Sequence, residues 1–475
     1  FLYLVGIIQA APTTDTINTT TSDSSEAPSF TTRTIWSIIS SSILTLIACI
    51  YSAIHPNIPS PRDSPLRILR RRLGIMIMAL IAPELIVTWA MRQWISARQV
   101  TRQFEKSGYP SVRLESEDHG STEATAEQYV EDHDSIRLLI AHPKVPTSRY
   151  EGTWHTLVKP FKKFLKAYVS EQSEDYTWTQ EHSFFVLMGG FMLYVDGKPY
   201  HTLQPDEVLK LIRTECIDAP TLTANQIRDK SKGNVLSKGL IMLQVAWFVM
   251  QLVTRAIYHL ETTQLEVGTL AFAVLNFLTY AVWWNKPLDV RCPHPIYWKS
   301  TESRPEDHIY DVPEIDAHSE YGIFSPVLGP IEEVIGLSYI PTSRKLRVPT
   351  FDGSIDLEDS NKTVLQLTAL FMVTIFGGIH CMAWFFSFPT YQEQVLWRIS
   401  AVAITFTPWL CFLARFIPDS LLGIVGFVFG LICLVSVILY ITVRALLLVL
   451  MCTALRNLPS GAYQAVSWTT LVPHL

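Results

Sequence analysis

The chain has 475 residues, of which 48% are hydrophobic and only 17% are charged. Soluble domains carry about a quarter charged residues, so this composition argues against an ordinary water-soluble protein. The formal net charge of −5 offers no basic surface for nucleic acid, and we expect no nucleic-acid partner. The apolar residues stand in long blocks rather than at amphipathic spacing, which indicates that a lipid bilayer surrounds much of the chain.

The first residues have the composition of a targeting segment. Residues 1–8 are apolar and small residues follow, which predicts that residues 1–11 are the end of a signal peptide. Residues 12–34 are rich in Thr and Ser and hold a sequon at Asn18, so we expect an exoplasmic, glycosylated N-terminus. A short membrane anchor followed by a spacer is the alternative interpretation.

Seven apolar runs are long enough to cross a bilayer as helices, because about 20 residues span the hydrocarbon core. We therefore predict an all-α membrane protein, a polytopic bundle of about seven transmembrane helices. Its expected location is the plasma membrane or the secretory pathway, with the lipid bilayer as its first partner. The runs are residues 35–54, 73–95, 239–258, 267–285, 364–388, 395–414 and 420–443, in three groups at 35–95, 239–285 and 362–443.

Polar segments separate and follow these groups. Residues 97–238 are expected to form a large loop domain whose acidic part, 113–135, is disordered. Residues 286–361 are rich in Pro, Asp and Glu and predict a second polar loop. Residues 444–475 resemble an amphipathic tail at the membrane interface.

Within the first loop, Phe184 to Val195 is apolar but too short to span the bilayer. A re-entrant segment and a buried strand that turns at Asp196-Gly197 are both open. We favour a segment that docks against the bundle.

The orientation signals conflict. Five arginines in the connection 55–72 favour the cytosol, in agreement with an N-terminus outside. Strict alternation would then place residues 97–238 outside. Basic residues at both flanks of that loop and its lack of a sequon favour the cytosol instead. A cytosolic loop, which we favour, requires either a re-entrant hairpin at 73–95 or one miscounted half-span.

Glu84 is the most informative polar residue in a predicted span. It follows Pro83, which interrupts helical hydrogen bonding and predicts a kink. An ionisable group in the bilayer is costly and often marks function, here the binding of a cation or the relay of a proton. The alternative is a protonated carboxyl group that hydrogen-bonds a neighbouring helix.

Other polar residues line up along single helix faces. Gln244, Gln251 and Arg255 are spaced by seven and four residues, and Asn276 continues the pattern on the next predicted span. Two such stripes would either line a pathway for an ion or small polar solute or hold two helices together. Arg255 could instead extend to the interface. His380 lies in a later span as a structural hydrogen bonder or as a catalyst, with Asn276 as its candidate partner.

The run from Trp283 to Lys286 is typical of an interfacial anchor, with Trp283, Trp284 and Lys286 as candidates for contact with lipid headgroups.

Gly426 and Gly430 form a GxxxG motif, which serves helix packing and permits a homo-oligomer. Nucleotide-binding motifs and zinc-binding spacings are missing from the sequence, so we expect no cofactor and no metal. Cys216 and Cys292 would pair if both faced an oxidising compartment.

The chain resembles a large family of multi-spanning membrane proteins from fungi, most of them uncharacterised. This resemblance implies a fungal source and a shared membrane architecture over most of residues 35–475, and it implies no activity. The matching stretches are Pro83-Glu84 with Trp94, Met188-Gly189-Gly190-Phe191, Asp229 to Gly233, Trp283 to Val290, and Pro473-His474-Leu475.

Three classes of function follow from these residues. A channel or transporter would use Glu84, Gln244, Gln251 and Asn276 as one polar cavity. A membrane-embedded enzyme acting on lipid or acyl substrates would use His380. A receptor or scaffold fits the count of seven spans. Of these three classes we favour transport, and we expect that the protein is not an enzyme.

Overall fold

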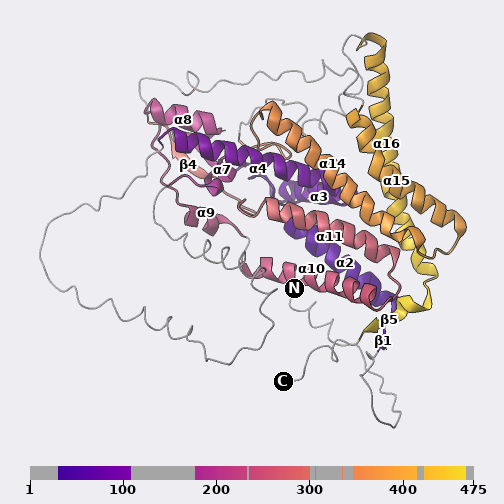
Figure 1. The fold of residues 1–475 in the computed structure, drawn as a ribbon. Coiled ribbons are helices and arrows are strands. Elements are labelled where there is room, and N and C mark those ends of the chain that lie inside the picture. The colour runs from indigo at the N-terminus through magenta and orange to yellow at the C-terminus, as the bar shows by residue number, and fades with distance from the viewer. Residues whose placement is uncertain are drawn as a thin grey trace, which may run out of the picture.

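The structure is a computed structural model that describes residues 30–108, 177–232, 235–299, 346–413 and 422–466, with Pro305 and Val334. The predicted signal peptide, the sequon at Asn18 and the acidic part at 113–135 lie outside these residues. The described helices are α2 (Ile35–Ala53), α3 (Pro65–Ile81), α4 (Pro83–Lys106), α7 (Gln180–Leu187), α8 (Pro205–Arg213), α9 (Ala224–Lys230), α10 (Val235–Ile257), α11 (Gln264–Val282), α14 (Asp359–Cys381), α15 (Tyr391–Leu413) and α16 (Leu422–Thr453) (Figure 1). The described strands are β1 (Phe30–Thr32), β2 (Phe191–Val195), β3 (Lys198–Thr202), β4 (His294–Tyr297) and β5 (Gln464–Val466).

The helices α2, α11, α14 and α16 contain the segments that are long and apolar enough to cross a membrane, which is compatible with a location in the membrane. Their starts follow local chemistry: the side chain of Thr34 caps α2, and Thr263 and Glu266 form a capping box at the start of α11. The four spans found in the described residues are Ile35–Ala53, Gln264–Val282, Asp359–Phe385 and Leu431–Arg456.

The prediction of seven spans is not confirmed. In helix α10 the described apolar stretch is Ile241–Ile257, which is shorter than the candidate spans. The helix α15 is present where a span was predicted, but its first turns hold charged residues (Glu393 and Arg398), and it is not among the candidate spans of the described residues.

The predicted span 73–95 is broken in two. At Ala82, α3 and α4 meet at an angle of 114°, far more than a kink, so the pair is a broken span or a re-entrant segment. Pro83 explains the break, because it lacks an N–H group and stands at the first position of α4, where helices tolerate proline.

The predicted amphipathic tail from residue 444 is wrong in its first part. A single helix, α16, runs to Thr453 without interruption, so residue 444 lies in a helix interior. The only charge within this apolar helix, Arg444, is buried against the bundle rather than placed at an interface.

The prediction of an all-α protein is also wrong in one respect, since a small sheet is present. Its strand order is β3-β2-β4, with β2 antiparallel to β3 and parallel to β4. Asp196 and Gly197 both have positive φ (49° and 72°), the conformation that a tight hairpin turn requires. The segment from Phe184 to Val195 is therefore half helix (α7) and half strand (β2), and it is buried.

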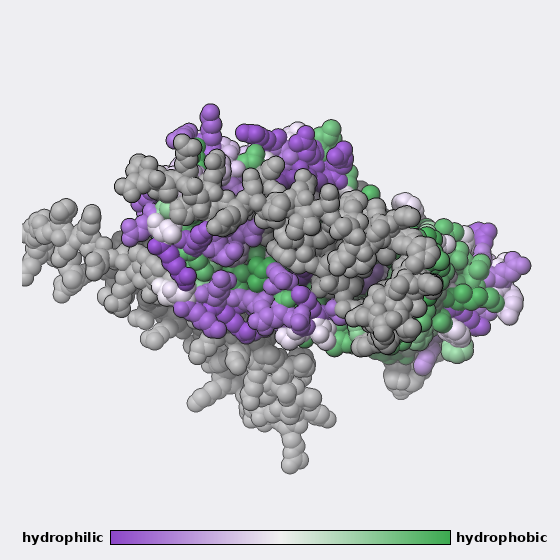
Figure 2. Space-filling model, turned by 90° about the horizontal axis from the view of Figure 1, so that it is seen from above, coloured by the Kyte–Doolittle hydropathy of each residue, from purple (hydrophilic) through white to green (hydrophobic). Residues whose placement is uncertain are grey.

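The elements form two regions. In the membrane-helix region (α2, α10, α11, α14, α15 and α16), α2 packs against α10 and α11, and α14 packs against α4, α11 and α15. The sheet region (α7, α8, α9 and β2–β4) lies at the far end of α4 (Figure 1). Hydrophobic residues gather toward the end that holds α15 and α16, and hydrophilic ones over the end that holds α8 (Figure 2).

Candidate functional site

A buried ion pair joins the start of α4 to the middle of α16. The Glu84 carboxylate accepts a hydrogen bond from Arg444 Nη2 at 2.7 Å and another from the hydroxyl of Tyr440. Both side chains of the ion pair are only 4% exposed. Tyr440 and Arg444 are four residues apart, so they project from one face of α16.

The position of Glu84 follows from the broken helix. Because α4 starts at Pro83, the carboxylate stands in the first helical turn, where the helix dipole favours negative charge. An isolated charge would be strongly disfavoured among these apolar helices, and its pairing with Arg444 removes most of that cost.

The far side of Arg444 is lined by aromatic rings and by the imidazole of His380. The guanidinium carbon lies 3.5 Å from the centroid of the Phe376 ring, a cation–π contact. The imidazole Nδ1 is 2.8 Å from the carbonyl oxygen of Phe376. Arg444 Nε and His380 Nε2 are both buried and have no hydrogen-bond partner among the described residues, and both residues line a void of about 10 Å³. We call Glu84, His380, Tyr440 and Arg444 the Arg444 cluster.

A larger cavity of about 320 Å³ opens on the other side of this cluster. It lies between the break at Ala82 and the helices α14, α15 and α16, and most of its lining is aliphatic. Its volume is within the range of small-molecule sites, about 300–1,000 Å³. The polar residues that line it are Glu84, Thr88, Gln366, Thr407, Ser436 and Tyr440.

The structure does not bring the predicted polar seam together. Gln244 donates to Thr45 Oγ1 at 3.3 Å, a contact between α10 and α2, and Gln251 is half-buried. The side-chain amide of Asn276 donates to the carbonyl oxygen of Phe272 and lines a separate cavity of about 20 Å³. Among the cavities found in the described residues, no cavity is lined by Glu84 together with Gln244, Gln251 or Asn276.

Lys286 is buried rather than placed at a membrane surface, which corrects the headgroup interpretation. It is 2% exposed, and Trp283 is fully buried, while Trp284 is 40% exposed. The ammonium donates to the carbonyl oxygen of His55 at 2.6 Å and to Gln93 Oε1 at 2.9 Å, with a longer contact to Asn57 Oδ1 at 3.4 Å. It also lies over the rings of Trp283 and Trp89, at 4.6 Å and 5.2 Å from their centroids.

A turn at Asp352-Gly353 closes this arrangement. The carbonyl oxygen of Asp352 accepts from Gln93 Nε2 at 2.7 Å and from Asn57 Nδ2 at 3.0 Å. Gly353 has a φ of +100°, and a Cβ atom there would lie 2.7 Å from Gln93 Nε2, so only glycine fits. We call His55, Asn57, Gln93, Lys286 and Asp352 the Lys286 network.

The Lys286 network lacks a counterion in the part of the chain that the structure describes, since no carboxylate oxygen there lies within 4.0 Å of Lys286 Nζ. Burial lowers the pKa of Lys286 well below its usual range. The network ties four chain segments together and has no cavity beside Lys286 for a ligand among those found, so we interpret it as structural.

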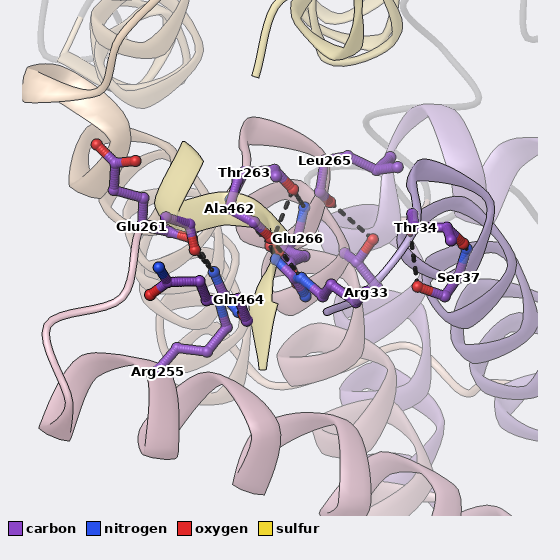
Figure 3. Close-up of polar contacts among 12 residues, drawn as sticks. Arg33, Thr34, Ser37, Arg255, Glu261, Thr263, Leu265, Glu266, Ala462 and Gln464 are labelled. Atoms are coloured by element: carbon purple, nitrogen blue, oxygen red, sulfur yellow. Dashed lines mark hydrogen bonds and ion pairs between the residues drawn. The ribbon is translucent and has the colours of Figure 1, made fainter. Parts of the chain in front are cut away.

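Arg255 belongs to a third polar cluster, where the two ends of the described chain meet (Figure 3). Its guanidinium donates to the carbonyl oxygens of Gln464 at 2.6 Å, Gly461 at 3.0 Å and Glu261. Beside it, Arg33 binds both carboxylate oxygens of Glu266, at 2.5 Å and 3.2 Å. This clasp holds the antiparallel pair β1–β5 against α10 and α11, and Arg255 is buried in it and lines none of the cavities found in the described residues.

The remaining candidates have simpler placements. Cys216 is buried and Cys292 is exposed, and both are free thiols. Gly426 and Gly430 lie in α16, in a stretch whose side-chain surroundings are outside the described part. In the residues searched, no group of three or more His, Cys, Asp or Glu could hold a metal ion.

Sequence reasoning missed Tyr440 and Arg444, the partners of Glu84. The signal was present, because Arg444 is a single charge inside a long apolar run. From the sequence alone, Arg444 was assigned to an interfacial tail, because the apolar residues before it were already numerous enough to span a bilayer. Gln93 and Asp352 gave no local signal, since their roles depend on segments far apart in the chain.

No curated protein and no solved structure matches the chain. A family model does match, over residues 2–140 and 162–309, which is more than half of the sequence. Glu84, Gln93 and Lys286 lie in the matched residues, whereas His380, Tyr440 and Arg444 lie beyond them. The chain therefore belongs to the family of unknown function DUF8562.

Proposed function

We propose that this protein is a multi-pass membrane protein that binds an apolar molecule with a hydroxyl end group, such as a long-chain alcohol or a sterol. The cavity at the α3–α4 break would hold the apolar body. The observation that carries this proposal is an aliphatic cavity of about 320 Å³ with a buried ion pair at one side.

The residues at the polar end suggest the type of end group. Glu84 and Tyr440 line the cavity, whereas Arg444 stands behind them. A hydroxyl group can donate to the Glu84 carboxylate, while a carboxylate ligand would be repelled by it. The surrounding helices supply an apolar entry route, because α14 and α15 carry exposed apolar side chains such as Phe371 and Leu410.

A pair of tryptophan variants tests this proposal. Ala369 lines the cavity, and Ala369→Trp should fill it, while Leu367→Trp adds a similar bulk on an exposed position of the same helix. The purified protein in nanodiscs is labelled with a photoreactive long-chain alcohol, with unlabelled alcohol as competitor. We expect roughly tenfold less competed labelling for Ala369→Trp only. Equal labelling of both variants, at equal melting temperature, would overturn the proposal.

Transport of an ion or small polar solute is the second candidate. It is supported by an ionisable pair at a broken helix, a combination that membrane transporters use at their binding sites. Proteoliposomes with an entrapped pH dye or a labelled solute test it. Flux above that of empty liposomes, lost in Glu84→Gln, would support transport, and the absence of flux would argue against it. The use of His380 in an enzyme, a receptor role, the fungal source and glycosylation at Asn18 stay predictions.

A further inference from the structure

A small pocket lies beneath α3, on the side of this helix that faces the protein. Its cavity of about 40 Å³ is bounded by the connection before α3, α3 itself, the segment after α11 and residues 347–350. One water molecule needs roughly 10–15 Å³ of such space, so a group of several heavy atoms fits. Four arginines line the cavity: Arg71, Arg72, Arg291 and Arg347.

Among the residues that the structure describes, the carboxylates around this pocket are too few to neutralise the arginines. Asp63 pairs with Arg71 at 2.6 Å and with Arg67 at 3.3 Å. Burial raises the pKa of Asp63, but the hydrogen bonds from Arg71 and from the Ser60 backbone outweigh it and hold this pKa below its usual value. Asp63 is therefore a fixed negative charge that two guanidinium groups already share.

The second carboxylate, Asp289, is shared in the same way. It lies 3.4 Å from Arg72 and 4.0 Å from Arg291. Arg347 forms no ion pair within 4.0 Å in the described part of the chain, and burial and the neighbouring Arg71 lower its pKa. Four guanidinium groups thus share two carboxylates, and Arg347 stands beside them without one, which leaves an excess of three positive charges among the described residues.

Arg72 offers a hydrogen-bond donor that nothing uses. Its Nε is buried and has no partner in the described structure, although its guanidinium is held by Asp289 and by the ring of Tyr51, 4.5 Å away. An arginine that is fixed at two points and keeps a free donor is already arranged to receive an oxyanion.

Buried apolar side chains form the inner wall of the pocket. Ile75, Val290 and Val348 line it and are each at most 3% exposed. The opposite face of α3 carries exposed aliphatic side chains at helical spacing: Leu66, Leu69, Leu73 and Ile77. This pattern is the one expected of a helix that lies along a membrane surface with its apolar face in the lipid, and in that position the pocket would face water close to the headgroups.

We propose that this pocket binds a phosphate group in the form carried by phosphomonoesters. The geometry combines a charge excess, an unused arginine donor and space for a tetrahedral oxyanion. Guanidinium groups bind phosphate oxygens through paired hydrogen bonds, and a dianion offsets more of the excess charge than chloride does. The group can come from a soluble phosphomonoester or from the headgroup of phosphatidic acid. This inference does not depend on the alcohol-binding cavity.

The test uses the full chain in detergent and in nanodiscs. Binding of inorganic phosphate is measured by calorimetry at constant ionic strength, and binding to nanodiscs with phosphatidic acid is compared with phosphatidylglycerol, whose phosphate is a diester. The double variant Arg291→Gln/Arg347→Gln removes two exposed pocket arginines. The matched control Arg62→Gln/Arg70→Gln removes two exposed arginines that do not line the pocket.

We expect the pocket variant to bind about tenfold or more weakly and the control to stay within about twofold of the natural protein. Binding of free phosphate supports a soluble ligand, and binding to phosphatidic acid alone supports a lipid headgroup. The absence of both, or an equal loss in the control, would overturn the proposal, because the arginines would then act only as a general positive surface.

Discussion

Two buried basic side chains in this protein are stabilised in different ways. In the membrane-helix region, Arg444 pairs with the carboxylate of Glu84 at 2.7 Å. In the Lys286 network, the ammonium is held by neutral oxygen atoms and two indole rings, without a carboxylate in the described residues. A guanidinium group that stays charged among apolar helices needs an opposite charge. A lysine whose pKa is lowered by burial can instead be held by neutral oxygen atoms of the connecting segments.

The Glu84–Arg444 pair is a candidate binding site, whereas the Lys286 network is structural. The Glu84–Arg444 pair borders a cavity on one side and a void on the other, so a ligand can reach it. Lys286 itself lines none of the cavities found in the described residues, although Asn57 of the same network borders the pocket beneath α3, and the network joins four separate parts of the chain. The four predictions below test this distinction, from the largest expected effect to the smallest.

Removal of one member of the ion pair should have the largest effect. Glu84→Gln leaves Arg444 buried without a counterion, and we expect a loss of about 3–5 kcal/mol in the free energy of unfolding. The double variant Glu84→Gln/Arg444→Met should recover part of this loss. Unfolding in mixed detergent micelles measures the free energy of unfolding of each variant. The control is Asp218→Asn, which removes the exposed ion pair Asp218–Lys299 and should change this free energy by less than about 1 kcal/mol. An additive double variant would show that the two groups do not interact.

Lys286→Met should destabilise the protein less, by about 2–3 kcal/mol. The substitution removes the Lys286 donor from the buried carbonyl oxygen of His55 and from Gln93 Oε1, which keeps only its hydrogen bond from Trp283 Nε1. The same unfolding assay measures the loss, and photolabelling by the alcohol probe should be unchanged. A large loss of labelling at normal stability would show that the Lys286 network is not only structural.

Gly353→Ala should cost about 1–3 kcal/mol, because an alanine at a φ of +100° is strained and its Cβ would displace the Gln93 amide. The control is Gly378→Ala in α14, where a Cβ meets nothing within 4 Å. Alanine there should be neutral or stabilising by up to about 1 kcal/mol. Equal melting temperatures of the two variants would contradict the role given to the Asp352-Gly353 turn.

Acidification should weaken the sheet region modestly. Burial lowers the pKa of His182, although its hydrogen bond to the carbonyl oxygen of Leu222 opposes the shift. Below a pH of about 6.5 the unfolded chain therefore binds a proton that the folded chain does not, and stability falls as the pH falls through this value. The melting temperature should drop between pH 7.5 and 5, and less so in His182→Gln, which keeps a side-chain acceptor at the third helical position. An equal drop in both proteins would assign the effect to other groups.

The apolar runs predicted the existence of α2, α10, α11, α14, α15 and α16, because a helix is the conformation that satisfies every backbone group in lipid, but the run for α16 ended ten residues too early. The Asp196-Gly197 turn was also present as an alternative, since that dipeptide favours a hairpin. Pro83 marked the break between α3 and α4, but a proline alone does not determine an angle of 114°. Which neighbours pack against the two halves decides that angle.

From the sequence alone, it follows that several long runs of this chain are suited to a bilayer and that Glu84 and Arg255 are ionisable groups within those runs. Only the tertiary structure decided the partners of Glu84 and Lys286, because Glu84 and Arg444 are 360 residues apart and Lys286 and Gln93 are 193 apart. Local periodicity reports which face of a helix is apolar. The partner of a buried charge depends on how distant segments pack, and that information is in no single stretch of the chain.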